Sequence, residues 1–289
     1  MTTRPEERDR DDTSSSVLRD GTPSYILRGG DAGAARLRIL GAATRATTLR
    51  LLERAGVTAG QRVLDAGCGS GEVTAELARI VGPDGHVTAL DADAVVLEHA
   101  RVRVRGVRER VTLVRADVAQ PYPAEVPRDH DVAFARFLLS HLVAPEAALA
   151  HLRDAVRPGG TIVVEDVDFP GHFCHPPSAA FARYVELYQA VARHHGADAA
   201  IGPRLPALLR AAGLYDVRVD VAQPAFLDGD GKSVAQLTLA GIRDAAIAAS
   251  LSDAAEIDAL VATLDEERRA PDTLHGIARI VQAWGTRRS

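Results

Sequence analysis

The sequence is poor in cysteine, and it contains no long apolar run. Its two cysteines, Cys68 and Cys174, are too few for a disulfide framework of the kind found in small secreted domains, and they fit a reducing cytoplasm. The amino terminus is polar and charged rather than a signal peptide, and no apolar run is long enough to cross a membrane. We therefore expect a cytoplasmic protein that has no membrane partner.

A surplus of basic residues is also absent. The formal net charge is −5 at pH 7, so no overall positive field favours nucleic acid as a partner. The 289 residues are 46% apolar and 25% charged, which is typical of a globular chain that buries a sizeable core. This composition agrees with a soluble enzyme.

The most informative segment is RVLDAGCGSGE at residues 62–72, where an apolar strand runs into an acidic, glycine-rich turn. Gly67, Gly69 and Gly71 have no β-carbon, so the backbone can turn tightly and a ligand can approach it closely. Asp65 stands at the end of the strand, where its carboxylate can face a positive ligand group. This combination favours S-adenosylmethionine, whose methionine end carries an ammonium, over a dinucleotide pyrophosphate.

The spacing of the glycines supports this choice. A dinucleotide fingerprint reads G-x-G-x-x-G/A, whereas here the third position is Glu72. A nicotinamide-dependent oxidoreductase is therefore a weaker alternative. Any one of the acidic residues in this region also suits an ordinary turn or helix cap, so their joint placement carries the argument.

Acidic residues also end the next two expected strands. Residues 86–90 lead to Asp91 and Ala92, where a carboxylate can bind ribose hydroxyls. Residues 111–116 lead to Asp117 and Val118, which can accept from an adenine amino group and pack on the adenine face. A fourth strand over 131–135 leads to Arg136, and a fifth runs over 161–165 after the turn at 157–160.

These motifs resemble the class I S-adenosylmethionine-dependent methyltransferases, over roughly residues 51–165 and more loosely to residue 284. The resemblance implies a Rossmann-like α/β fold with a seven-stranded mixed sheet and helices on both faces. It also implies that S-adenosylmethionine is converted to S-adenosylhomocysteine. The family roles map the methionine cradle to Asp65, Gly67, Gly69 and Gly71, the ribose acid to Asp91 and the adenine-side acid to Asp117; Ala92, Val118 and Arg136 complete the expected cofactor contacts.

The chain divides into five expected segments. Residues 1–20 read as a disordered tail and 21–56 as an N-terminal helical cap, in which Tyr25 is either a lid over the cofactor or an aromatic anchor. Residues 57–231 form the cofactor-binding core. A helical insertion over 232–270 suits a lid or a dimer surface, so a homodimer is possible, and 271–289 hold the closing strand.

Candidates for catalysis follow the fifth strand, in the segment 165–175. Asp166, Asp168 and His172 lie there, at the carboxyl end of a parallel strand where ligands bind in such sheets. His141, after the fourth strand, is a further candidate. A general base is needed only when the acceptor holds its proton near neutral pH. A solvated acidic loop with surface histidines is the alternative interpretation.

Missing motifs narrow the choice of acceptor. The fourth strand ends in Ala135-Arg136 rather than in the acid of metal-dependent catechol-type methyltransferases, so no metal is expected. The (Asp/Asn)-Pro-Pro-(Tyr/Phe) turn of base-amino and glutamine methyltransferases is absent as well. We expect a small acceptor of hydrophobic or aromatic natural-product type, methylated on oxygen, nitrogen or carbon. A non-catalytic cofactor-binding sensor or partner subunit, and an RNA methyltransferase, are the remaining alternatives.

Overall fold

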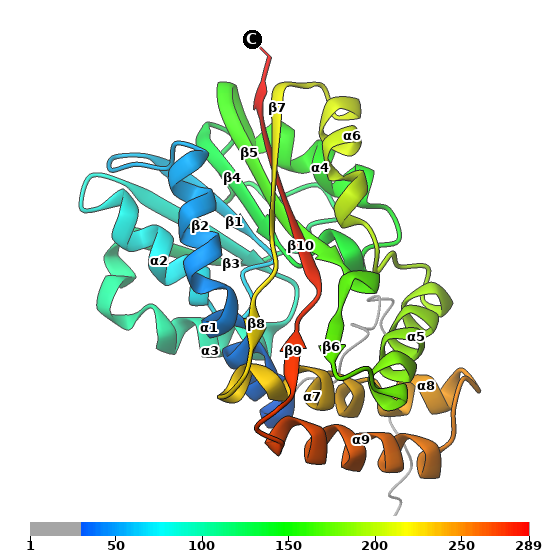
Figure 1. Cartoon of the computed structure of the whole chain (residues 1–289). Coiled ribbons are helices and arrows are strands. Elements are labelled where there is room, and N and C mark those ends of the chain that lie inside the picture. The colour runs from blue at the N-terminus through cyan, green and yellow to red at the C-terminus, as the bar shows by residue number, and fades with distance from the viewer. Residues whose placement is uncertain (1–29, 289) are drawn as a thin grey trace, which may run out of the picture.

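A seven-stranded mixed sheet forms the centre of the computed structural model, which describes residues 30–288 (Figure 1). Its strand order is β3-β2-β1-β4-β5-β10-β7. The five strands from β3 to β5 run parallel, and β10 is antiparallel to both β5 and β7. The strands span β1 (Arg62–Ala66), β2 (His86–Asp91), β3 (Val111–Arg115), β4 (His130–Arg136), β5 (Val156–Asp168), β7 (Leu214–Ala222) and β10 (Arg279–Arg287).

Helices cover both faces of this sheet (Figure 1). The alternation of side chains along each strand divides the core into two layers. Val63, Phe134 and Val163 pack with leucines of α1 and α2 on one face, whereas Leu64 and Ile162 pack with α4 and α6 on the other. The helices around the sheet are α1 (Gly30–Arg54), α2 (Glu72–Val81), α3 (Ala94–Arg103), α4 (Pro145–Ala155) and α6 (Leu205–Ala211).

A smaller subregion lies beyond the carboxyl end of β5 and the amino end of β10 (Figure 1). It holds a three-stranded sheet of order β6-β9-β8 and a separate hydrophobic core that includes Tyr184, Leu239 and Ile257. Its elements are β6 (Phe173–His175), β8 (Ala225–Phe226), β9 (Leu274–Gly276), α5 (Ala179–His194), α7 (Val234–Gly241), α8 (Arg243–Ala248) and α9 (Ala254–Arg269). Short 3₁₀ helices connect the elements: η1 (Arg105–Arg110), η2 (Leu139–His141), η3 (Phe169–Gly171), η4 (Gly202–Arg204) and η5 (Asp230–Ser233).

The predicted fold class, a Rossmann-like seven-stranded mixed sheet with helices on both faces, is confirmed. The fifth strand is longer than predicted, because its residues 161–168 pair with 279–286 of β10. The segment 165–168 is therefore strand and not loop. The closing strand predicted near 276–284 is two strands, β9 and β10. The five-part division of the chain stays a prediction, and Tyr25 and the 1–20 tail lie outside the described residues.

Strand order reverses at β1, which has β2 on one side and β4 on the other. In open parallel sheets, ligands bind in the crevice at the carboxyl ends of the strands where this reversal occurs. The glycine-rich turn follows β1 directly, so the fold places it in that crevice.

Candidate active site

The glycine turn after β1 has a backbone that only glycine adopts easily. Gly67, Gly69 and Gly71 have φ angles of 70°, 54° and 81°. A β-carbon on Gly67 would lie 2.8 Å from Leu138 Cδ1, so the turn packs closely against the segment after β4. At Gly69 no atom lies within 4 Å of such a β-carbon. The tip of the turn therefore faces open space, as a cradle for a ligand requires.

Asp91 ties this turn to the end of β2. Its Oδ2 accepts a hydrogen bond from the Gly69 N–H at 2.9 Å, and its Oδ1 accepts one from the Asp93 N–H at 3.0 Å. Burial raises the pKa of Asp91, and the backbone N–H groups of Asp93, Gly69 and Ala92 oppose that shift. A carboxylate has about four acceptor positions, so Asp91 keeps acceptor capacity for a ribose hydroxyl.

Asp65 is almost fully buried beneath the turn, with 2% of its surface exposed. Its Oδ2 accepts a hydrogen bond from Thr74 Oγ1 of α2 at 2.6 Å. Burial raises the pKa of Asp65 to about 6, although the Thr74 hydroxyl favours the ionised form. A positive group at the turn would lower this pKa.

The remaining strand-end residues are engaged with neighbouring backbone. Asp117 Oδ1 accepts from the Ala119 N–H at 2.9 Å in a local turn. Val118 is 5% exposed and packs in the core below α4, so little of it faces outward. Ala92 is half-buried, and its carbonyl accepts from Arg115 Nε at 3.1 Å. The cofactor roles of these residues stay predictions.

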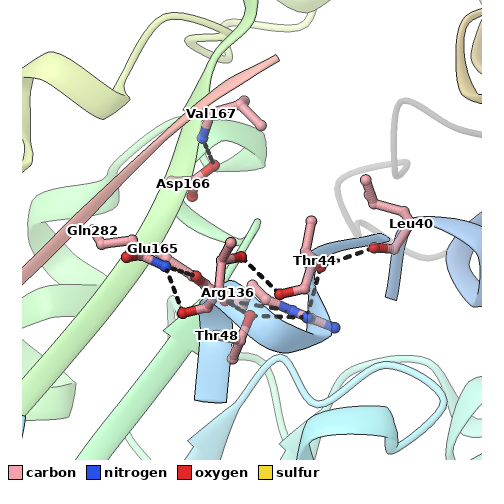
Figure 2. Close-up of polar contacts among 9 residues, drawn as sticks. Leu40, Thr44, Thr48, Arg136, Glu165, Asp166, Val167 and Gln282 are labelled. Atoms are coloured by element: carbon pink, nitrogen blue, oxygen red, sulfur yellow. Dashed lines mark hydrogen bonds and ion pairs between the residues drawn. The ribbon is translucent and has the colours of Figure 1, made fainter. Parts of the chain in front are cut away.

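Arg136, at the end of β4, joins a buried polar network under α1 (Figure 2). Its Nη1 donates to Thr44 Oγ1 at 3.2 Å and to Thr48 Oγ1 at 3.4 Å. Glu165 lies 3.9 Å from Arg136 Nε, and it accepts from Thr48 Oγ1 at 2.5 Å and from Gln282 Nε2 at 2.8 Å. Arg136 thus connects α1 to β4 and β5 through two hydrogen bonds from Nη1 and one ion pair with Glu165. Its predicted contact with the cofactor stays a prediction.

A largely apolar pocket adjoins this network. Its empty volume is about 590 Å³, part of which opens to solvent. The walls come from α1, from the segments after β4 and β5, and from α5, α7 and the start of β10. They comprise Arg36, Leu37, Leu40, Phe137, Ser140, His141, Val167, Phe169, His172, Tyr184, Tyr188, Val234, Thr238, Ile277, Ala278 and Ile280.

Phe137 and Leu138 connect the pocket to the glycine turn. Leu138 fills the space beside Gly67, and the adjacent Phe137 lines the pocket. Phe137 has a φ of 50°, which is unusual for a bulky residue, and its N–H donates to the Glu165 carbonyl at 2.9 Å. Strained residues of this kind concentrate at functional sites. A molecule in the pocket would therefore lie beside the cofactor cradle.

The structure divides the four catalytic candidates into two pairs. His141 and His172 line the pocket. Asp166 and Asp168 do not, because side chains alternate along β5 and Val167 is the one that lines it. Asp166 instead accepts from the Ser140 N–H at 3.1 Å, and Asp168 forms an ion pair with Arg279 at 3.3 Å. The sequence alone did not indicate which of residues 166–168 face the pocket, since the strand was expected to end at residue 165.

His172 sits within an aromatic cluster. Its Nδ1 lies 2.9 Å from the Phe169 carbonyl, so this nitrogen carries the proton, and its Nε2 lies 3.4 Å from Tyr184 Oη. Phe169 stacks on Tyr188 with centroids 3.8 Å apart. Burial lowers the pKa of His172 to about 4, and burial lowers that of His141 to about 4 as well. Both imidazoles are neutral at pH 7 and are weak bases, better suited to orienting a ligand than to removing a proton.

Sequence reasoning missed several pocket residues. Phe137 carried no signal, because nothing in the local sequence marks its φ of 50°. Thr238 and Val234 lie in the segment predicted as a helical lid or dimer surface, but neither residue was singled out. Among residues 36–288, no three His, Cys, Asp or Glu side chains gather as a metal site would need. Over the described chain, no helix meets the length and apolarity required of a membrane span.

Comparison with known proteins agrees with this geometry. Residues 63–160 match the methyltransferase domain family model. A Shewanella pealeana protein named ubiquinone/menaquinone biosynthesis C-methyltransferase UbiE is 33% identical over 124 residues, which are 42% of this chain and 48% of the relative. The chain thus matches about half the length of the curated relative.

Two solved structures share the fold. A Bacillus halodurans C-125 protein superposes with a TM-score of 0.56 at 15% identity, covering 83% of this chain and 98% of the other. Phosphoethanolamine N-methyltransferase 2 from Haemonchus contortus, in complex with S-adenosyl-L-methionine, gives 0.51 at 19% identity, covering 84% and 53%.

Together, the fold, the glycine cradle with its strand-end carboxylates and the family match define the class. The chain carries a class I S-adenosylmethionine-dependent methyltransferase domain. The predictions of this class and of S-adenosylmethionine as its cofactor are confirmed at the level of the domain. The open side of Gly69 and the free acceptor positions of Asp91 fit that cofactor.

Proposed function

We propose that the protein transfers a methyl group from S-adenosylmethionine to a small, apolar or aromatic acceptor, with release of S-adenosylhomocysteine. The single observation that carries this proposal is the mainly apolar pocket beside the cofactor cradle, joined to it through Phe137 and Leu138. Pockets that bind small molecules are concave and apolar with a few placed polar groups, as this one is. The partner would be a small molecule, without nucleic acid or membrane, in the cytoplasm, and a homodimer stays possible.

The side chains of the protein need to supply little of the chemistry in this reaction. Bound S-adenosylmethionine supplies an electrophilic sulfonium methyl and a neutral leaving group. Gly67, Gly69 and Asp91 would hold the cofactor, while Phe137 and Phe169 would orient the acceptor ring and exclude water. Holding two reactants in line supplies much of the acceleration in such displacements. His172, neutral and already donating through Nδ1, would orient an acceptor hydroxyl through Nε2 if Tyr184 gives up that contact.

Carbon is the acceptor atom to test first. The matched relatives are named ubiquinone/menaquinone biosynthesis C-methyltransferases. The family match ends at residue 160, however, and within it lie only three pocket residues: Phe137, Ser140 and His141. The other thirteen come from parts of the chain outside that domain. The acceptor therefore does not follow from the relatives.

A pocket-filling variant tests the proposal. Val234→Phe places a larger side chain in the pocket wall, and we expect it to lower S-adenosylhomocysteine formation by about tenfold or more in the presence of the small-molecule fraction of the source organism. Affinity for S-adenosylmethionine should not change, since Val234 lies on α7 and not in the cradle. Val219→Phe, the same substitution at an exposed position of β7, is the matched control. Equal turnover in both variants would remove this pocket from the reaction.

A further inference from the structure

A second, smaller void adjoins the acceptor pocket. Its empty volume is about 180 Å³ including the part open to solvent, and its enclosed part is about the size of one water molecule. The two spaces share His172, Val234 and Ile277 in their walls. Because these three residues line both spaces, the void lies next to the pocket, and a ligand in the pocket would extend toward it.

His275 of β9 lines this void and is 4% exposed. Nδ1 of its ring is buried and has no hydrogen-bond partner within residues 36–288. This nitrogen needs a partner in either tautomer, as an acceptor when the proton is on Nε2 and as a donor when it is on Nδ1. Burial and the Lys232 ammonium lower the pKa of His275, so the ring stays neutral. A buried polar atom without a partner is rare in native proteins.

Lys232 determines which ligand group fits here. This residue is the only lysine of the chain, and it is 3% exposed. Its Nζ donates to the Leu227 carbonyl at 3.2 Å, the Ala270 carbonyl at 2.8 Å and Thr273 Oγ1 at 2.7 Å. All three ammonium protons are used, so a carboxylate or phosphate would find no free donor on Lys232. The hydrogen-bonding position left unfilled at this end of the site is His275 Nδ1.

We propose that His275 Nδ1 forms a hydrogen bond with a hydroxyl group of the acceptor, at the end remote from the methylated atom. This inference rests on the proposed function, because the acceptor must occupy the adjoining pocket. It narrows the substrate class to an elongated aromatic or apolar molecule with a neutral hydroxyl group at its far end. His275 is then a specificity-determining residue.

Two matched pairs of probes test the inference by binding alone. They are 4-hydroxybiphenyl against 4,4′-dihydroxybiphenyl, and 4-benzylphenol against bis(4-hydroxyphenyl)methane. Each is titrated into the full chain saturated with S-adenosylhomocysteine, and calorimetry gives Kd. We expect the second hydroxyl to tighten binding by about tenfold in at least one pair, as one hydrogen bond to a buried side-chain atom does.

Two variants of His275 separate recognition from packing. His275→Phe keeps an aromatic ring but removes Nδ1, so it should abolish the preference for the second hydroxyl. His275→Asn places an amide oxygen where Nδ1 lies, so it should retain part of the preference. His194→Phe, at an exposed position, is the control and should behave as the wild type. Thermal melts confirm that each variant is folded.

The outcomes are distinguishable. Equal binding within both pairs, or a preference that persists in His275→Phe, would overturn the inference while leaving the pocket and the proposed function intact; a bound water would then occupy the void. Failure of all four probes to bind would overturn the inference and count against the proposed acceptor pocket as well.

Discussion

Asp91 accepts a hydrogen bond from the backbone N–H of Gly69, with 2.9 Å between Oδ2 and N. This contact joins the end of β2 to the tip of the turn that follows β1. Because Gly69 has a φ of 54° and an open side, the turn depends on this carboxylate for its position as well as on its own glycines. One side chain thus orders the cradle and still offers acceptor positions to a ligand.

Asp91→Ala should therefore weaken S-adenosylmethionine binding by about ten- to a hundredfold, because it removes charge-assisted hydrogen bonds to the turn and to the ribose. The far-ultraviolet circular dichroism spectrum should not change. Calorimetric titration measures the affinity. Asp93→Ser, which keeps a capping side chain at the start of α3, is the control, and unchanged affinity in Asp91→Ala would refute the ribose assignment.

Alanine substitutions at two glycines should have different effects. Both positions have positive φ, so each substitution costs about 1 kcal/mol of backbone strain. Gly67→Ala adds a contact of 2.8 Å with Leu138 and should lower the melting temperature further than Gly69→Ala does. Gly69→Ala should keep the fold unchanged and place a methyl group in the space beside the turn where the ligand would lie, so it should mainly reduce cofactor affinity. Equal affinity in Gly69→Ala and the wild type would mean that no ligand lies there.

Cofactor binding should depend on pH through Asp65. Its pKa of about 6 makes it largely protonated at pH 5, and an ammonium bound nearby would favour the ionised form. Affinity should therefore rise by roughly tenfold from pH 5 to pH 7 and stay level above, with proton release near pH 6. Calorimetry in buffers of different ionisation enthalpy measures this release.

Asp166 provides a matched control for that experiment. Burial also raises its pKa to about 6, but it lies on β5 and contacts Ser140 rather than the turn. Asp65→Asn should flatten the pH dependence, while Asp166→Asn should preserve it. The same affinity at pH 5 and pH 7 in the wild type would contradict the placement of the ammonium beside Asp65.

The network under α1 should contribute to stability. Thr48→Val leaves the buried Glu165 Oε1 without its 2.5 Å donor, and we expect a loss of about 1–3 kcal/mol in the free energy of unfolding. Thr47→Val lies one residue away and removes only a bond to the Thr44 carbonyl within the helix, so it should cost about 0.5 kcal/mol or less. Urea unfolding measures both. Similar losses would show that the contact between α1 and Glu165 adds nothing.

The cofactor side of the site was predictable because its signals are local. A strand, a glycine turn and an acid at each of three strand ends can be recognised within about ten residues, and the structure places Asp65 and Asp91 at one sheet edge around the turn. The same segments also predicted the parallel part of the sheet. Parallel strands buried on both faces have a recognisable composition.

The acceptor side was less predictable because its residues converge from distant parts of the chain. Arg36 and Ile280 lie in the walls of one pocket although 244 positions separate them. Whether Asp166 or Val167 faces that pocket depends on where β5 ends, and pairing with β10 extends this strand beyond the expected boundary. Long-range pairing of this kind leaves no mark in the local sequence.

Methyl transfer to a small acceptor is the central claim, and isotope transfer tests it most directly. The protein is incubated with S-adenosylmethionine carrying a deuterated methyl group and with fractionated extract of the source organism, and mass spectrometry follows the label. We predict label in one small, largely apolar metabolite, and loss of that signal in Val234→Phe. Label confined to RNA or protein, or confirmed cofactor binding with no label in any fraction, would contradict the claim.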